Sequence, residues 1–134
     1  MAENKEKKNR LKGFTKIVAK EVEPLNNIEK FKEDFKEREI RILLNPKDGK
    51  QAAMIVIDHG KIYVDGIENK PKKNIKKKNA NWDGFFETDT KTFADLLGGG
   101  DITTGQIVKK LLTRKAKIRG IKNVLVLLKL FEYE

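Results

Sequence analysis

The first apolar residues of the chain recur every three or four positions, which is the spacing of one face of a helix. They are Phe14, Ile17, Val18 and Val22. Pro24 lacks the backbone N–H that a helix interior needs, so the pattern predicts a helix that ends before this residue. The same spacing predicts a second helix over residues 28–35, with Asn26 or Asn27 capping its start.

From residue 39 onward the helical period gives way to the alternation of a strand. The apolar positions of this first strand are Ile40, Ile42 and Leu44. Residues 52–58 are apolar on both faces and predict a more central strand. A tight turn at His59-Gly60 then leads into a third strand over residues 61–65. Together these segments predict an antiparallel meander.

The second half of the chain predicts a strand, two helices, another strand and a closing apolar segment. Residues 82–87 alternate as a fourth strand should, and Asp89 or Thr90 is placed to cap a short helix after it. A capping-box spacing that begins at Thr103 predicts the next helix. Residues 117–119 are expected to form a short basic strand.

The final segment is apolar on nearly every side. The residues that fit one helix face are Ile121, Val124, Leu125, Leu128 and Phe131. Further apolar residues on the other sides are Val126, Leu127 and Leu130. An isolated surface helix does not carry so much apolar surface. We therefore expect the segment to be buried in the core, or to cover something apolar that is not protein.

This order of elements, together with two local motifs, resembles the sterol carrier protein type 2 domain. In the first motif an acidic or Thr cap is followed by a Phe-x-x-Leu-Leu helix that ends in Gly, here residues 93–98. In the second motif a basic strand ends at a glycine before the closing apolar helix, here Lys-Ala-Lys-Ile-Arg-Gly over residues 115–120. The resemblance covers residues 15–131.

The resemblance implies an α+β fold in which helices cover one face of a five-stranded, mostly antiparallel sheet. It also implies a non-catalytic protein with an apolar tunnel for a fatty acyl, sterol-like or isoprenoid ligand. Such a ligand gains roughly 0.8 kcal/mol for each methylene removed from water, so its tunnel needs aliphatic and aromatic walls. The candidate lining residues are Phe86, Phe93, Leu97, Ile107, Leu111, Val124, Leu127, Leu128 and Phe131. Taken singly, each is more simply a core residue, but the apolar excess of the last segment favours a cavity for the set.

The positive charge of the chain is concentrated in two short segments. The 134 residues carry 30 Lys and Arg against 20 Asp and Glu, a formal net charge of +10. Residues 1–12 hold five bases and two acids, and residues 70–78 hold six lysines and no acid, so the two segments account for nine of the ten charges. We expect a polar arm over residues 1–12, one domain over residues 13–134, and an irregular lysine-rich loop over residues 69–79.

The lysine-rich loop has two functional interpretations besides plain solvation. Each lysine near an anionic bilayer contributes about 1 kcal/mol to reversible attachment, which favours transient membrane docking. The docking residues would be Lys70, Lys72, Lys73, Lys76, Lys77 and Lys78. The alternative is a basic nucleic-acid-binding domain. However, only 7% of the residues are aromatic, none lies in the lysine run, and no zinc-finger or RNA-recognition motif is present.

No motif of the chain indicates catalysis, a cofactor or a metal. The absence of cysteine excludes disulfides, thiolate zinc sites and thiol catalysis. His59 is the single histidine, and no partners for a triad or a metal site are evident, so a hairpin turn is the better interpretation. Residues 98–101 precede a helix start, but they lack the Gly-Lys-Ser/Thr ending of a P-loop, and Asp101 would repel an anion.

The sequence also bears on cellular location. The longest aliphatic runs, residues 52–57 and 124–128, are far shorter than the roughly 20 residues that span a bilayer. The first twelve residues are charged and lack the apolar core of a secretory signal. We therefore expect a cytoplasmic protein.

Overall fold

The computed structural model of the chain describes residues 13–97, 116–130 and 133. Its elements in chain order are α2 (Phe14–Val22), η1 (Glu23–Asn27), α3 (Glu29–Phe35), β1 (Glu39–Pro46), β2 (Gln51–Asp58), β3 (Lys61–Glu68), η2 (Lys72–Ile75), α4 (Lys77–Ala80), β4 (Gly84–Thr88), α5 (Thr90–Leu97), β5 (Lys117–Arg119), α7 (Ile121–Val124) and α8 (Val126–Leu130), with η marking 3₁₀ turns. The predicted arm over residues 1–12 and the helix expected after Thr103 lie outside the described residues. Within the described part, no helix combines the length and apolar character that crossing a bilayer requires.

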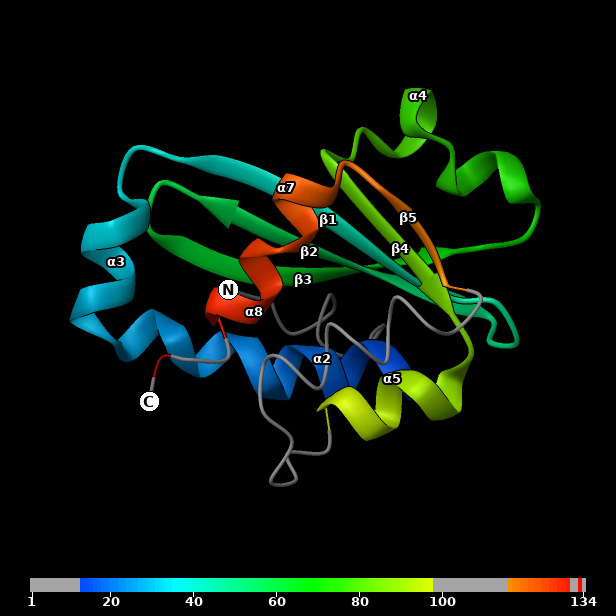
Figure 1. Cartoon of the computed structure of the whole chain (residues 1–134), viewed down its shortest axis with the longest axis horizontal. Coiled ribbons are helices and arrows are strands. Elements are labelled where there is room, and N and C mark those ends of the chain that lie inside the picture. Colours follow the sequence, from blue (N-terminus) through cyan, green and yellow to red (C-terminus); the bar gives the residue numbers. More distant parts are fainter. Residues whose placement is uncertain (1–12, 98–115, 131–132, 134) are drawn as a thin grey trace, which may run out of the picture.

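The five strands form one mixed sheet in the order β3-β2-β1-β4-β5 (Figure 1). The predicted meander is confirmed, because β1 pairs antiparallel with β2 and β2 pairs antiparallel with β3. β4 lies parallel beside β1, and β5 pairs antiparallel with β4. This confirms the α+β class and the mostly antiparallel sheet. β3 and β4 run in the same direction, and β2 and β1 lie between them in the sheet. The chain therefore needs a long connection from β3 across the sheet to β4, and the lysine-rich segment provides it.

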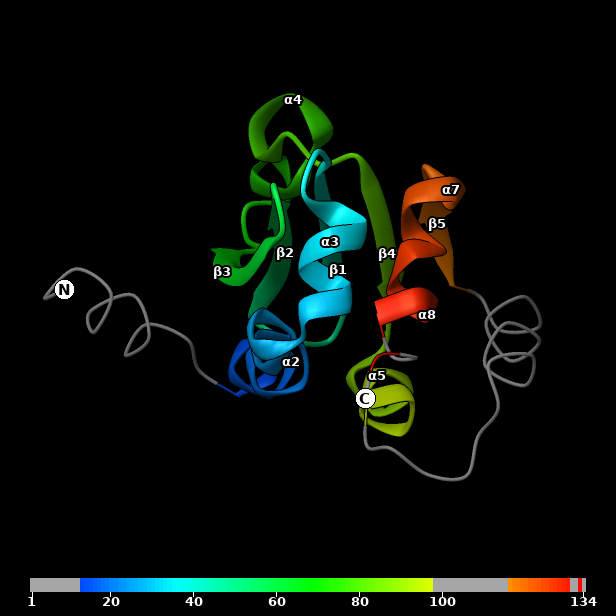
Figure 2. The same cartoon turned by 90° about the vertical axis from the view of Figure 1, so that its left-hand side faces the viewer.

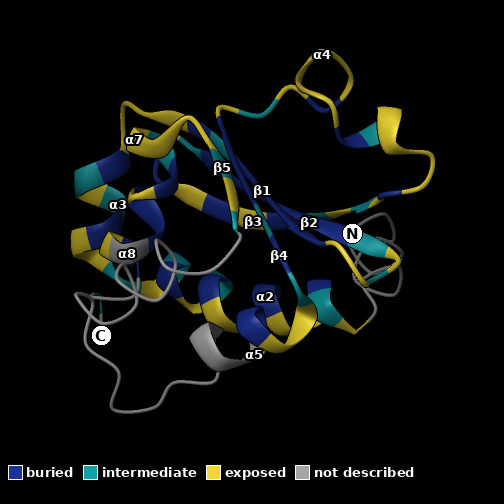
Figure 3. Ribbon diagram, turned by 45° about the vertical axis from the view of Figure 1, so that its right-hand side comes forward, coloured by how far each residue is buried: buried dark blue, intermediate teal, exposed yellow. Residues whose placement is uncertain are grey.

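Helices cover one face of this sheet, as Figure 2 shows from the side. The strand residues that point toward them share one buried apolar cluster with α2, α3, α5, α7 and α8. These strand residues are Ile40, Ile42, Leu44, Ala53, Ile55, Ile57, Ile62, Val64 and Phe86. They follow the two-residue alternation of a strand, so every second side chain reaches the same face. Figure 3 shows β1 and β2 buried along most of their length.

The lysine-rich segment covers part of the opposite face, and it is not the irregular loop that we expected. It contains η2 and α4, in which Ile75 and Ala80 are buried. With the half-buried Trp82, these residues pack against a second apolar cluster that includes Leu43 and Phe85. Ile75 lies at the centre of the lysine run, and its burial, with that of Ala80, holds the segment on the sheet.

The predicted asparagine cap of the second helix is wrong. The residue before α3 is Ile28, which makes no side-chain cap bond. Asn26 instead bridges to the edge strand β3: its Nδ2 donates to the Ile62 carbonyl at 2.8 Å, and its Oδ1 accepts from the Ile62 N–H at 2.9 Å. Bonding to an otherwise unpaired strand edge satisfies backbone groups that a cap would have left open, and it ties the helices to the sheet.

The start of α5 is capped as predicted. Asp89 Oδ1 accepts from the Thr92 N–H at 2.7 Å. A second carboxylate, Asp48 in the turn after β1, accepts from both the N–H and the hydroxyl of Thr90, at 2.7 and 2.8 Å. The Thr90 N–H is the main cause that lowers the pKa of Asp48. Two acidic side chains therefore fix where α5 begins.

Candidate functional site

The nine residues expected to line a tunnel fall into three groups. Those buried in the apolar cluster between the sheet and its helices, each no more than 6% exposed, are Phe86, Phe93, Val124 and Leu127. Those that belong to α5 and α8, with side chains outside the described part, are Leu97 and Leu128. Those that lie wholly outside the described residues are Ile107, Leu111 and Phe131. Residues 98–101, which precede the helix expected after Thr103, also lie outside the described part.

An aromatic contact joins three elements in this apolar layer. The Phe93 ring of α5 lies 5.1 Å from the Phe86 ring of β4 and 4.9 Å from the Phe14 ring of α2, both tilted. These centroid distances are in the favourable range for aromatic pairs. Phe14 was not among the predicted lining residues, although its place on the same helix face as Val18 was the available signal.

A second aromatic group lies where the C-terminal segment meets α3. The Tyr133 ring is 5.8 Å from Phe31 and 6.5 Å from Phe35, with edge-to-face geometry. The Tyr133 hydroxyl donates a hydrogen bond to Asp34, and this bond is the main cause that lowers the pKa of the Asp34 carboxyl. Lys129 places its ammonium group 5.6 Å from the centre of the Phe35 ring. The end of the chain is thus attached to α3.

The final segment is two short helices, α7 and α8, with Leu125 between them. The described side chains that it buries are Val124, Val126, Leu127 and Leu130. Ile121 and Leu125 are exposed, at 53% and 45%. The final segment is apolar on nearly every side, as the sequence indicated. One face of it is buried in the apolar cluster, while Ile121 and Leu125 are exposed to solvent.

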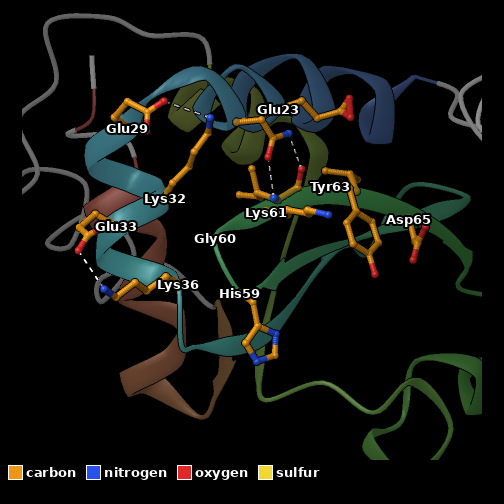
Figure 4. Close-up of a pocket in the computed structure, with 13 residues that line it drawn as sticks. Glu23, Glu29, Lys32, Glu33, Lys36, His59, Gly60, Lys61, Tyr63 and Asp65 are labelled. Atoms are coloured by element: carbon orange, nitrogen blue, oxygen red, sulfur yellow. Dashed lines mark hydrogen bonds and ion pairs between the residues drawn. The ribbon is translucent and has the colours of Figure 1, made fainter.

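An open groove of about 950 Å³ lies between α3 and β3, away from the predicted lining residues (Figure 4). Ion pairs of α3 stand along it, Glu29 with Lys32 at 3.3 Å and Glu33 with Lys36 at 3.1 Å. A second groove, of about 340 Å³, lies beside Arg41 of β1 and is lined mainly by polar residues. None of the four predicted lining residues whose side chains are described borders either groove. The larger groove mixes Ile62, Tyr63 and Val64 with charged residues, and both grooves are open to solvent, so neither encloses an alkyl chain as a tunnel would.

The predicted turn at His59-Gly60 is confirmed. Asp58 pairs with Lys61 across it, and both turn residues have positive φ, 50° and 84°, as in a type I′ hairpin. His59 Nδ1 lies 2.6 Å from Asp58 Oδ1. Ligand atoms of Glu39, Asp58 and His59 lie within 4.8 Å of one another, but all three groups are at least partly exposed, and such groupings are common without a bound ion.

The charge of His59 is expected to depend on Asp58. The hydrogen bond that the Asp58 carboxylate accepts from the imidazole is the main cause that raises the pKa of His59 above 6.5, and the charge of Glu39 contributes least. The raised pKa favours the protonated form in the folded protein. Its contribution to stability is therefore present below pH 6.5 and is lost as the pH rises through the folded-state pKa.

An NMR titration of the single histidine should give a midpoint above 6.5. In Asp58→Asn the midpoint should move down toward the ordinary histidine value, whereas Glu39→Gln should move it less. An unchanged midpoint in Asp58→Asn would rule out the carboxylate as the cause.

The six lysines named for membrane docking are all exposed and lie in one segment. They extend from Lys70, before η2, to Lys78 in α4. Lys77 places its ammonium group 5.5 Å from the centre of the Trp82 ring. The lysines therefore share one patch of surface that is separate from the apolar layer under α8.

Comparison with known proteins identifies the fold. A solved structure described as UbiJ-SCP2, a ubiquinone synthesis protein, has 12% identity and a TM-score of 0.55, covering 90% of this chain and 93% of its own. A conserved hypothetical protein from Thermus thermophilus, whose description suggests a sterol carrier protein, has 15% identity and a TM-score of 0.51, covering 90% and 88%. A scan of protein-family models and a search of curated proteins gave no match. The chain therefore has the fold of sterol carrier protein type 2 domains, as the resemblance implied.

Proposed function

We propose that this protein binds and transfers a lipid without catalysing a reaction on it. The ligand would be a fatty acyl, sterol-like or isoprenoid molecule held between the sheet and the C-terminal segment. One observation carries the proposal: the final segment turns its aliphatic side chains onto the same apolar layer as Phe86 and Phe93. The shared fold supports it, while neither neighbour is described as a nucleic-acid-binding protein.

The energetics favour such a ligand. Each methylene transferred from water to an apolar layer gains roughly 0.8 kcal/mol, so a dozen methylenes gain about 10 kcal/mol before the costs of association are subtracted. That amount supports useful affinity without any polar anchor. The segment that covers this layer, α7 and α8, is short. A ligand could therefore enter beneath it by opening only the contacts of these two helices.

Replacing Leu127 by tryptophan should block the proposed site. Leu127 is 6% exposed and faces the apolar layer, so an indole at this position would occupy space that several methylenes of the ligand use. In a titration with a fluorescent fatty acid, we expect saturable binding by the wild type and affinity at least tenfold weaker for Leu127→Trp.

The matched control is Ile121→Trp, which adds the same indole at a side chain that is 53% exposed. Its affinity for the fatty acid should equal that of the wild type. If the wild type fails to bind and Leu127→Trp also lowers the melting temperature by several degrees, the layer is a filled core, since overpacking a filled core is destabilising.

A further inference from the structure

The lysine-rich segment is fastened to the sheet by more than one kind of contact. Ile75 is buried against the sheet face that the helices leave free. The Trp82 indole N–H donates to the Ile75 carbonyl at 2.9 Å. Arg41 of β1 reaches across and donates from Nε to the Asn81 carbonyl at 3.0 Å. These contacts hold the backbone that carries the lysines in place. A solvated linker would have no such contacts.

Among the described residues, the lysines of this segment lack the acidic partners that the lysines on and just after α3 have. On α3, Lys30, Lys32 and Lys36 each lie 3.1–3.7 Å from a carboxylate of the same helix. Among the described residues, none of the six lysines between residues 70 and 78 forms an ion pair. Six like charges on an ordered segment repel one another, and an anionic partner would relieve this repulsion. We call these six side chains the lysine surface.

The lysine surface stands at one end of the molecule. Figures 1 and 2 both place α4 at the upper end, and α2 and α5 at the lower end. The segment projects beyond the sheet in both views, so a broad, flat partner can approach it without meeting the helical layer.

We propose that the lysine surface is a preformed docking site for an anionic lipid bilayer. Each lysine within a Debye length of such a membrane raises the affinity about fivefold. A bilayer fits better than a single-stranded nucleic acid, because stacking needs accessible rings. Trp82, the aromatic residue that follows this segment, has its ring centre 5.2 Å from that of Phe85, and its N–H is already bonded to the Ile75 carbonyl. The proposal does not depend on what the protein carries.

Vesicle titrations of the full chain test this docking site. Trp82 is the single tryptophan, so energy transfer from it to a dansyl-labelled lipid reports approach of the segment to the membrane. We expect binding to vesicles of phosphatidylcholine with phosphatidylglycerol, and none to phosphatidylcholine alone. The variant K72Q/K76Q/K78Q, which spares the Lys77 contact with Trp82, should bind about a hundredfold more weakly.

The matched control removes three exposed lysines from α2 and α5, K16Q/K20Q/K91Q, and so loses the same charge at the opposite end. Its affinity should fall less than about fivefold. Both variants should melt with the wild type, since all six positions are exposed. Equal losses in the two variants, or no binding to the anionic vesicles, would overturn the proposal.

Tighter binding of a single-stranded oligonucleotide than of vesicles would likewise overturn it, in favour of nucleic acid. Vesicle binding requires no transfer of cargo. Its failure would therefore leave the lipid-carrier proposal intact, and failure of the fatty-acid titration would leave the docking proposal intact.

Discussion

Replacing Phe93 by alanine is expected to lower the free energy of unfolding by about 3–5 kcal/mol. Phe93 is 2% exposed, and its ring packs against both Phe14 and Phe86. One side chain therefore joins α2, α5 and β4. Truncating it loses the transfer free energy of the ring and leaves a cavity where the three elements meet. Urea unfolding followed by circular dichroism gives the difference directly.

Phe93→Leu is the control for this variant, because leucine keeps an apolar side chain and leaves a smaller void. It should cost less than half of what the alanine variant costs. A loss below about 1 kcal/mol in Phe93→Ala would contradict the packing described here, because removing a buried ring that contacts Phe14 and Phe86 cannot be so mild.

Replacing Gly120 by alanine is expected to cost at least about 2 kcal/mol. Gly120 joins β5 to α7 with φ of 62°, a left-handed conformation that side chains other than glycine rarely adopt. A Cβ at this position would lie 2.2 Å from the Asp83 carbonyl oxygen, so the backbone must also shift. Asn123 Nδ2 donates to the same oxygen at 3.1 Å. The substitution therefore disturbs the attachment of the whole C-terminal segment.

Gly13→Ala separates backbone strain from the steric clash. Gly13 also has positive φ, 51°, but an added Cβ would meet nothing within 4 Å. When both glycine variants are unfolded in urea and followed by circular dichroism, Gly13→Ala should therefore lose clearly less free energy of unfolding than Gly120→Ala. Equal costs at the two glycines would mean that the close approach to Asp83 is unimportant. The fatty-acid affinity of Gly120→Ala should fall as well, because α7 and α8 follow this residue.

Periodicity predicted the strands and their buried faces, because alternation is a local property of the chain. The parallel pairing of β4 with β1 could not be read in the same way, since periodicity indicates which face is buried but not which strand lies alongside. The order of the lysine-rich segment, which was expected to be an irregular loop, could not be predicted for a different reason. Its charge dominated the pattern, while the few apolar residues within and beside it, Ile75, Ala80 and Trp82, pack it against the sheet.

The apolar layer was predictable only in part. Phe86, Phe93, Val124 and Leu127 occupy periodic apolar positions next to recognisable caps and turns, and the structure buries all four. Phe14 and Tyr133 join the aromatic contacts through partners far away in the sequence. The hydrogen bond between Tyr133 and Asp34 spans 99 positions, and no local pattern encodes such a pair.

Mass spectrometry of an organic extract of the purified full-length protein tests the central claim most directly. If the protein carries a lipid, the extract should contain one class of molecule with a long alkyl, sterol or isoprenoid part, near one per chain. The same molecule should be depleted in Leu127→Trp and retained in Ile121→Trp. An extract of the wild type with no lipid enriched over that of Leu127→Trp would contradict the account.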